Sequence, residues 1–389
     1  MTYTVPKKTP FRKPVVCYNP SMIHAFLSTL FVIVTSTFLF FFPMRTEGPT
    51  RTETKEKPAT VQKISTTTPV LVKQISTTTP VKKVVKKPTP EVTSTTTIVV
   101  QAPVVQKPTL DFVKINETSR KSVVNILCTT KGGELSPITG TGVIIDPRGI
   151  ILTNAHIGQY FLVKDFREKN YVHCIVRTGS PAYPRYNVEL MYISPRWVES
   201  NKDLLKQSNP QGTGEHDFAL LRITNSINKE PLPTFNYIAP NTEEITGEGD
   251  PVLLASYPAG FLGGLSVLQD LNITTAITTI KKIYTYQQNT VDLISVPGTV
   301  VSQKGASGGA VVDGDNKLIG IITTSSDGNS TSDRDLRAIT LSHINRSLLE
   351  ETTGNLSDLL SQNPDEVSRI FNTTIAPTLS KLIIDELKK

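Results

Sequence analysis

From about residue 110 onward, short apolar runs alternate with Gly, Pro, Asn and Asp. Most runs are rich in Val, Ile, Thr and Tyr, which is typical of strands that bury one face in a sheet. The runs occupy 122–130, 141–146, 149–155, 172–179, 218–223, 251–257, 276–286, 291–296, 309–313, 317–324 and 336–341. Their spacing predicts an all-β sandwich or a pair of barrels, and it disfavours alternating βα units.

Helical patterns are expected only near the C-terminus. Ser342 is a candidate cap for one helix, and Asn363 or Asp365 is a candidate start for a second. Apolar spacing over 378–389 predicts a last helix. We therefore expect a C-terminal helical extension over residues 351–389.

A continuous apolar stretch covers residues 22–42, MIHAFLSTLFVIVTSTFLFFF. As a helix it spans roughly 30 Å, the thickness of the hydrocarbon core of a bilayer. Basic but no acidic residues precede it, whereas both signs alternate after it, so the positive-inside rule predicts a single-pass protein of the cell membrane. Residues 1–21 would be a cytoplasmic tail, and the remainder would be extracytoplasmic. A cleaved signal peptide is the alternative, although its apolar part is normally shorter.

Residues 43–108 form a low-complexity segment rich in Thr, Pro, Lys and Val. The octapeptide KISTTTPV at 63–70 returns as QISTTTPV at 74–81. Because such a composition offers little apolar surface to bury, we expect a disordered linker ahead of a folded domain at 109–350. This linker is either a stalk or a spacer of no special use.

The positive charge is concentrated in the N-terminal part of the chain. The formal net charge is +7, and residues 1–108 carry 15 Lys and Arg against 4 Asp and Glu. The remaining residues carry 26 basic against 30 acidic side chains. Since a nucleic-acid-binding domain carries its positive charge on the folded surface, we expect no nucleic-acid partner.

Ser307 is a candidate nucleophile. It stands in the turn Gly-Ala-Ser-Gly-Gly at 305–309, between two expected strands. Glycines let the backbone turn sharply, so that the N–H groups of Gly305 and Ser307 can point at a developing oxyanion. A plain β-turn is the alternative interpretation of this segment by itself.

His156 and Asp217 are the candidate partners of this serine, because a hydroxyl needs a neighbouring base. His156 follows the strand-like ILTNA, and Asp217 opens the strand-like DFALLRI. His216 is a competing base. Adjacent residues of a strand point to opposite faces, however, so His216 and Asp217 are not expected to meet the same partner.

The order His, Asp, Ser along the chain is that of chymotrypsin. The segments TGVIIDPRGIILTNAH, HDFALLRI and GASGGAVVDGDNKLIGI resemble the active-site segments of trypsin-like serine peptidases, and they are most similar to the bacterial HtrA-like branch. GDPVLLASYPAG at 249–260 resembles the opening of that family's second barrel. The resemblance covers roughly residues 115–345.

This resemblance implies two six-stranded antiparallel β-barrels of the chymotrypsin type, with the site in the cleft between them. It implies that His156 is the general base, that Asp217 orients the imidazole, and that Ser307 attacks a peptide carbonyl to form an acyl-enzyme. We therefore predict a membrane-anchored serine endopeptidase that acts on protein or peptide substrates without a metal or cofactor. The rival interpretation is a catalytically inactive, protease-like binding module on a stalk. The oligomeric state stays open.

The chain departs from the family at two places. Ala306 stands where digestive relatives carry an aspartate that pairs with a freed N-terminus, so we expect no proteolytic activation. Only about 40 residues follow the matching segments, too few for the PDZ domain that HtrA-like relatives usually carry.

The family's specificity pocket maps onto Val301 and Thr324. Neither is acidic, so we expect a small or medium apolar side chain before the scissile bond.

Cys128 and Cys174 are a candidate disulfide. In the family's fold the first and fourth strands of the first barrel, which hold them, are neighbours. A disulfide could persist outside the membrane, and two buried free thiols are the alternative.

Overall fold

The computed structural model describes residues 110–389 except 208–212, 246, 326–329 and the side chains of 324–325. The expected tail, membrane helix and linker at 1–21, 22–42 and 43–108 lie outside the described residues. Within the described part, no helix is long and apolar enough to cross a bilayer.

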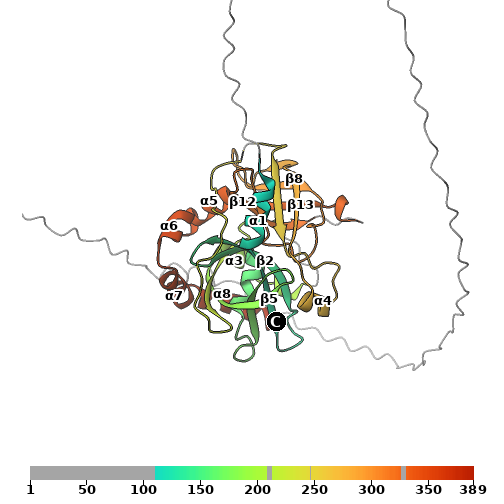
Figure 1. Ribbon diagram of the computed structural model, residues 1–389. Coiled ribbons are helices and arrows are strands. Elements are labelled where there is room, and N and C mark those ends of the chain that lie inside the picture. The colour runs from blue at the N-terminus through green and yellow to red at the C-terminus, as the bar shows by residue number, and fades with distance from the viewer. Residues whose placement is uncertain (1–109, 208–212, 246, 326–329) are drawn as a thin grey trace, which may run out of the picture. The chain divides into compact units, whose positions relative to one another are not determined.

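Six antiparallel strands close the first barrel, in the order β1-β2-β3-β6-β5-β4 (Figure 1). They are β1 (Val123–Thr130), β2 (Ile138–Asp146), β3 (Ile150–Thr153), β4 (Val172–Thr178), β5 (Tyr183–Ile193) and β6 (Ala219–Ser226). Gly149 connects β2 to β3 with φ +87°, a left-handed conformation that glycine adopts without steric cost. The prediction of a six-stranded first barrel is confirmed.

Seven strands form the second sheet, in the order β8-β7-β11-β12-β13-β10-β9. They are β7 (Pro251–Ser256), β8 (Thr274–Thr279), β9 (Lys282–Tyr284), β10 (Leu293–Pro297), β11 (Ala310–Val312), β12 (Leu318–Ser325) and β13 (Asp335–Thr340). The sheet curls into a half-barrel without closing, so the prediction of a second six-stranded barrel is wrong.

The two edge strands of the second sheet are consecutive in the chain. The run expected as one strand at 276–286 divides into β8 and β9. Between them, the Ile280 N–H donates to the Asp250 carbonyl at 2.9 Å, whereas the Lys281 N–H donates to the Ser295 carbonyl at 2.8 Å. β8 therefore pairs with β7, and β9 pairs with β10, at opposite ends of the sheet.

Four helices follow the second sheet at the C-terminus (Figure 1). They are α5 (Leu341–Glu351), α6 (Leu356–Ser361), α7 (Pro364–Thr374) and α8 (Ala376–Leu387). Helix α5 packs on β12 and β13, whereas α7 and α8 pack on the side of the first barrel. The Ser368 hydroxyl donates to the Leu190 carbonyl of β5 at 2.9 Å, and the Asn372 amide donates to the same oxygen at 2.6 Å. The predicted helical extension is confirmed, and it packs on the first barrel.

Helices also occur early in the chain, which the sequence pattern did not predict. They are α1 (Phe112–Ser122), α2 (Ala155–Leu162), α3 (Pro195–Ser200), α4 (Gly264–Gln269) and the 3-10 turns Leu204–Lys206 and Thr331–Asp333. Except for α1, these segments are too short for helical periodicity to be legible against a strand pattern. Local capping forms two of them: Asp111 accepts from the Lys114 N–H, and Ser194 accepts from the Trp197 N–H.

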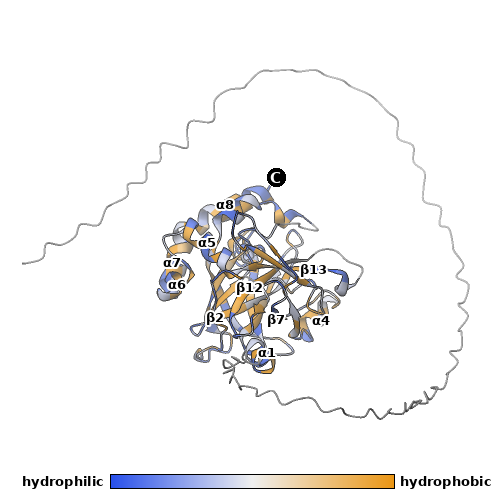
Figure 2. Cartoon of the chain, turned by 90° about the horizontal axis from the view of Figure 1, so that it is seen from above, coloured by the Kyte–Doolittle hydropathy of each residue, from blue (hydrophilic) through white to orange (hydrophobic). Residues whose placement is uncertain are grey.

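One hydrophobic core joins the barrel to the second sheet. The same buried cluster contains Ile126 and Leu220 of the barrel and Leu253 and Ile339 of the sheet, and a smaller cluster around Val311 fills the other face of the sheet. Figure 2 shows the apolar strands inside and the mixed surface of the C-terminal helices outside. This shared core fixes the loops that meet between the two parts.

Candidate functional site

Three distant segments come together between the barrel and the second sheet. His156 lies in the first turn of α2, Asp217 lies just before β6, and Ser307 lies in the turn before β11. Two further contacts join the parts: Thr141 of β2 binds the Ser307 turn, and Thr323 of β12 binds Asp217. The barrel thus supplies the imidazole and the carboxylate, and the sheet supplies the hydroxyl.

His156 and Asp217 form a hydrogen-bonded pair. His156 Nδ1 lies 2.9 Å from Asp217 Oδ2, and the His156 backbone N–H donates to Asp217 Oδ1 at 2.9 Å. Burial raises the pKa of Asp217, but the attraction and hydrogen bonds of His156 oppose it and hold that pKa below its usual range. The charged carboxylate fixes the proton on Nδ1, so Nε2 carries the free lone pair that a base needs.

Thr323 is a functional residue that the sequence analysis missed. Its hydroxyl donates to Asp217 Oδ2 at 2.7 Å, and its side chain is buried. The sequence analysis assigned its neighbour Thr324 to the specificity pocket and named no further partner for Asp217. Thr323 therefore gives the carboxylate a second charge-assisted hydrogen bond, which helps to keep it ionised.

The Ser307 hydroxyl points at the carbonyl of the same threonine. Ser307 Oγ lies 3.5 Å from Thr323 O, which is long for a hydrogen bond between oxygens. Within the described residues, the hydroxyl makes no hydrogen bond to His156. The structure thus brings His156 and Asp217 into contact and places Ser307 beside Thr323, which itself touches Asp217.

Two glycines shape the turn that carries Ser307. Gly305 has φ +91° and Gly308 has φ +81°. A Cβ on Gly308 would lie 1.9 Å from the Thr141 carbonyl oxygen, so only glycine fits there. The Thr141 N–H also donates to the Ser307 carbonyl at 2.8 Å, and its hydroxyl donates to the Gly305 carbonyl at 2.7 Å. Thr141 therefore holds both carbonyls of the turn in place.

The backbone N–H groups of Gly305 and Ser307 are not engaged in hydrogen bonds within the described residues. Across 110–389, leaving out the gaps given above, neither donates to a backbone or side-chain acceptor. The carbonyls of both residues are already engaged by Thr141, which fixes the direction of the turn. Two unengaged N–H groups beside a serine hydroxyl are the type of donor set that an oxyanion hole requires.

Comparison with known families agrees with this geometry. Residues 140–321 match the trypsin-like peptidase domain. The chain contains a trypsin-like peptidase domain. A comparison with curated proteins found no match. The predicted family is confirmed, and the finer likeness to the HtrA-like branch stays a prediction.

The peptidase domain buries one of the two residues assigned to the specificity pocket. Val301 is fully buried in the smaller core cluster of the second sheet. The side chain of Thr324 lies outside the described part. The expected preference for an apolar residue before the scissile bond therefore stays a prediction.

His216 faces away from the pair formed by His156 and Asp217. It adopts φ +55° in a turn ahead of β6, and its Nδ1 lies 2.8 Å from the Ser347 hydroxyl of α5. The residue is thus not part of a strand, but the expectation that it takes a different partner from Asp217 agrees with these contacts.

Cys128 and Cys174 lie opposite each other on β1 and β4 of the peptidase domain. Their sulfur atoms are joined at 2.06 Å, with the Cα atoms 4.0 Å apart. The disulfide links strands that are 46 residues apart in the sequence. It therefore staples one side of the first barrel, away from the nucleophile turn.

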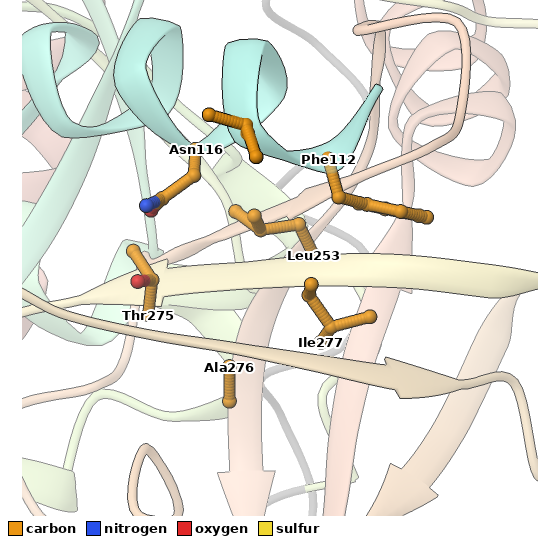
Figure 3. A pocket seen from close by; sticks show the side chains of 7 residues that line it. Phe112, Asn116, Leu253, Thr275, Ala276 and Ile277 are labelled. Atoms are coloured by element: carbon orange, nitrogen blue, oxygen red, sulfur yellow. The ribbon is translucent and has the colours of Figure 1, made fainter. Parts of the chain in front are cut away.

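One cavity of the peptidase domain lies away from the candidate catalytic residues. A cavity of about 330 Å³ lies between α1 and the strands β7 and β8, lined by Phe112, Val113, Asn116, Leu253, Thr275, Ala276 and Ile277. Figure 3 shows Phe112 and Asn116 reaching from the helix toward these strands. None of the predicted site residues lines it. Among the described residues, no group of three or more His, Cys, Asp or Glu side chains could hold a metal ion.

Proposed function

We propose that the chain is a serine endopeptidase with His156, Asp217 and Ser307 as its catalytic residues. The observation that carries the proposal is the 2.9 Å hydrogen bond between His156 Nδ1 and Asp217 Oδ2, formed beside a serine turn with two unengaged N–H groups. The match of residues 140–321 to a trypsin-like peptidase domain supports the same chemistry.

In the proposed mechanism, His156 Nε2 takes the proton of Ser307 Oγ as that oxygen attacks a peptide carbonyl. Asp217 keeps the imidazole oriented and stabilises its positive charge. The N–H groups of Gly305 and Ser307 bind the oxyanion of the tetrahedral intermediate. The imidazolium then protonates the leaving amine, and a water molecule hydrolyses the acyl-enzyme by the same steps. These side chains and backbone groups supply the whole reaction, so the proposal includes no cofactor.

The mechanism requires the Ser307 side chain to turn. Its hydroxyl now contacts the Thr323 carbonyl over a long 3.5 Å distance, so little hydrogen-bond energy is lost when it leaves. Rotation about χ1 moves Oγ from one staggered well to another. Catalytic hydrogen bonds are often made only when substrate is bound, which fits this arrangement.

A fluorophosphonate probe tests the proposal, since it reacts with a serine only when a base and an oxyanion hole activate that serine. We expect the domain from residue 109 onward to be labelled, and the Ser307→Ala variant to remain unlabelled. Casein hydrolysis should fall at least about a thousandfold in the same variant. An unlabelled wild-type domain with intact fold would contradict the proposal. It would favour the inactive binding module, for which the present contact of the Ser307 hydroxyl with Thr323 is the supporting observation.

We also propose that the enzyme is anchored in the cell membrane by residues 22–42, with its peptidase domain outside the cytoplasm. Support comes from the length of the apolar stretch and from the basic residues that precede it. Residues 43–108 then act as the linker to the domain. Extraction of membranes with alkaline carbonate tests this, because only a spanning protein stays in the membrane fraction.

A further inference from the structure

The connection between β7 and β8 exposes large apolar side chains. Phe261 is 72% exposed, Leu265 is 68% exposed and Leu268 is 51% exposed. They lie on α4 and the turn before it, and no residue of α4 is buried. The chain carries no charged residue from 251 to 269. Isolated surface apolar residues are normal, but a helix that buries none of its own is a feature of binding surfaces.

This exposed helix is nevertheless held firmly. Arg177 of β4 is almost fully buried, and its Nη1 donates to the Val267 carbonyl at 2.9 Å and to the Leu268 carbonyl at 3.1 Å. Its Nε donates to Asn125 Oδ1 at 2.8 Å inside the first barrel. A buried cation at the last carbonyls of a helix satisfies them and favours the helix dipole. The barrel therefore fixes a helix of which Val267 alone among the apolar side chains is partly buried against the core.

The helix adjoins the proposed oxyanion donors. The Ala259 N–H donates to the Lys304 carbonyl at 2.7 Å, one residue before Gly305. Gly260 is so close to this segment that a Cβ on it would lie 3.2 Å from the Lys304 nitrogen. The segment that leads into α4 thus contacts the turn that would bind the scissile carbonyl.

We infer that Phe261, Leu262, Leu265 and Leu268 form a docking surface for the polypeptide substrate. It binds apolar side chains that lie a few residues from the scissile bond. The inference rests on the proposed peptidase function. The occupant is the polypeptide substrate because the segment 259–260, which leads into α4, contacts the Gly305 turn. Arg177 also holds α4 in place before any ligand arrives, and the absence of charge from 251 to 269 favours apolar side chains.

The test compares two quenched fluorescent peptides with identical residues at the scissile bond. One carries Leu and Phe at the outlying positions, and the other carries Ser and Asn there. Wild type should cleave the apolar peptide faster. In the Phe261→Ser/Leu265→Ser variant, kcat/KM for the apolar peptide should fall about tenfold, while that for the polar peptide stays unchanged. The matched control is Ile370→Ser, an exposed apolar residue on α7, which lies across the molecule from α4 in Figures 1 and 2.

A second variant, Arg177→Met, keeps the apolar side chains but removes the bonds that hold α4. It should raise KM for the apolar peptide, with kcat little changed.

Fluorophosphonate labelling of Ser307 separates the docking proposal from the peptidase proposal, because the probe is too small to reach α4. Equal labelling of all variants with a selective loss for the apolar peptide supports the docking surface.

Three outcomes would overturn the inference while leaving the peptidase intact. The first is an unchanged ratio of kcat/KM for the two peptides in the double variant. The second is a wild-type oligomer that the double variant converts to monomer, which would make α4 a contact between copies. The third is binding to phosphatidylcholine vesicles that only the double variant loses. A wild type that no fluorophosphonate labels would instead refute the peptidase function itself.

Discussion

At the scale of single residues, Thr323 contacts both Asp217 and Ser307. Its hydroxyl donates to Asp217 at 2.7 Å, and its carbonyl is the present acceptor of the Ser307 hydroxyl at 3.5 Å. The residue comes from the second sheet, whereas Asp217 and His156 come from the barrel. One threonine therefore couples the charge of the carboxylate to the position of the nucleophile.

Replacing Thr323 by Val keeps the shape and removes the donor to Asp217. We expect kcat to fall about tenfold with KM little changed, because a charge-assisted hydrogen bond is lost. The pKa of Asp217 is held low partly by this bond, so the pKa should rise, and kcat of the variant should fall further below that of wild type at acidic pH, because the mechanism requires an ionised Asp217. Thr323→Ser, which retains the hydroxyl, should restore both. A variant with the wild-type pH profile would show that the bond does not matter.

The sequence was enough to find His156, Asp217 and Ser307, because each stands at the edge of a strand pattern and the glycines mark the serine turn. It was not enough to find Thr323 as a partner of Asp217. The pairing of β12 with β13 shifts register between Ile322 and Thr324, and such a bulge changes which face a side chain meets. Nothing in a run of Ile and Thr residues signals that shift.

At the scale of elements, α5 is tied to the second sheet through a buried carboxylate. Asp292 accepts from His343 Nδ1 at 2.8 Å and from Arg346 Nη2 at 2.5 Å, both on α5. It also accepts from the Tyr286 N–H at 2.6 Å and from the Thr290 hydroxyl at 2.6 Å. Burial raises the pKa of Asp292, but these donors together lower it well below its usual range.

The Asp292→Asn variant should lose about 3 kcal/mol of unfolding free energy at neutral pH, because it removes the buried, ionised acceptor of several hydrogen bonds, although Arg346 keeps its pair with Glu244. A carboxyl with a depressed folded-state pKa stabilises the fold above its unfolded pKa, and this stability is lost as pH falls through the folded value. The difference in unfolding free energy between wild type and the Asp292→Asn variant should therefore shrink below about pH 4. Urea unfolding at both pH values measures it. Asp315→Asn, at an exposed site, serves as the control and should change little.

Strands and late helices were predictable because their patterns are long. Five of the six strands of the first barrel coincide with expected runs, whereas β5 (Tyr183–Ile193), α2 and α4 were not predicted. The division of the run at 276–286 into β8 and β9 was not predictable, because the bend between them depends on the carbonyls of Asp250 and Ser295, which lie elsewhere in the chain.

At the scale of the whole molecule, the C-terminal extension belongs to the folded domain. Arg222 of β6 pairs with Asp365 at the start of α7, and Phe371 and Ile383 are buried against the barrel side. The sequence left open whether this segment packs on the barrel, contacts another subunit or stays loose. The packing of this segment on the barrel depends on polar contacts with β5 and β6, and these contacts cannot be read from a local sequence pattern.

The N-terminal anchor is the remaining prediction at this scale, and it can be separated from a cleaved signal peptide. Changing Phe31 and Val34 to Lys places two charges at the centre of the apolar stretch, at a cost of about 2.5–3.5 kcal/mol each for insertion. An anchored wild type should resist alkaline carbonate at its full mass, and the variant should be extracted. The same two Lys substitutions at Thr66 and Thr77 in the repeats of the linker are the control and should change nothing. A wild type that carbonate releases, with a mass lacking the first 40 or so residues, would establish the signal peptide instead.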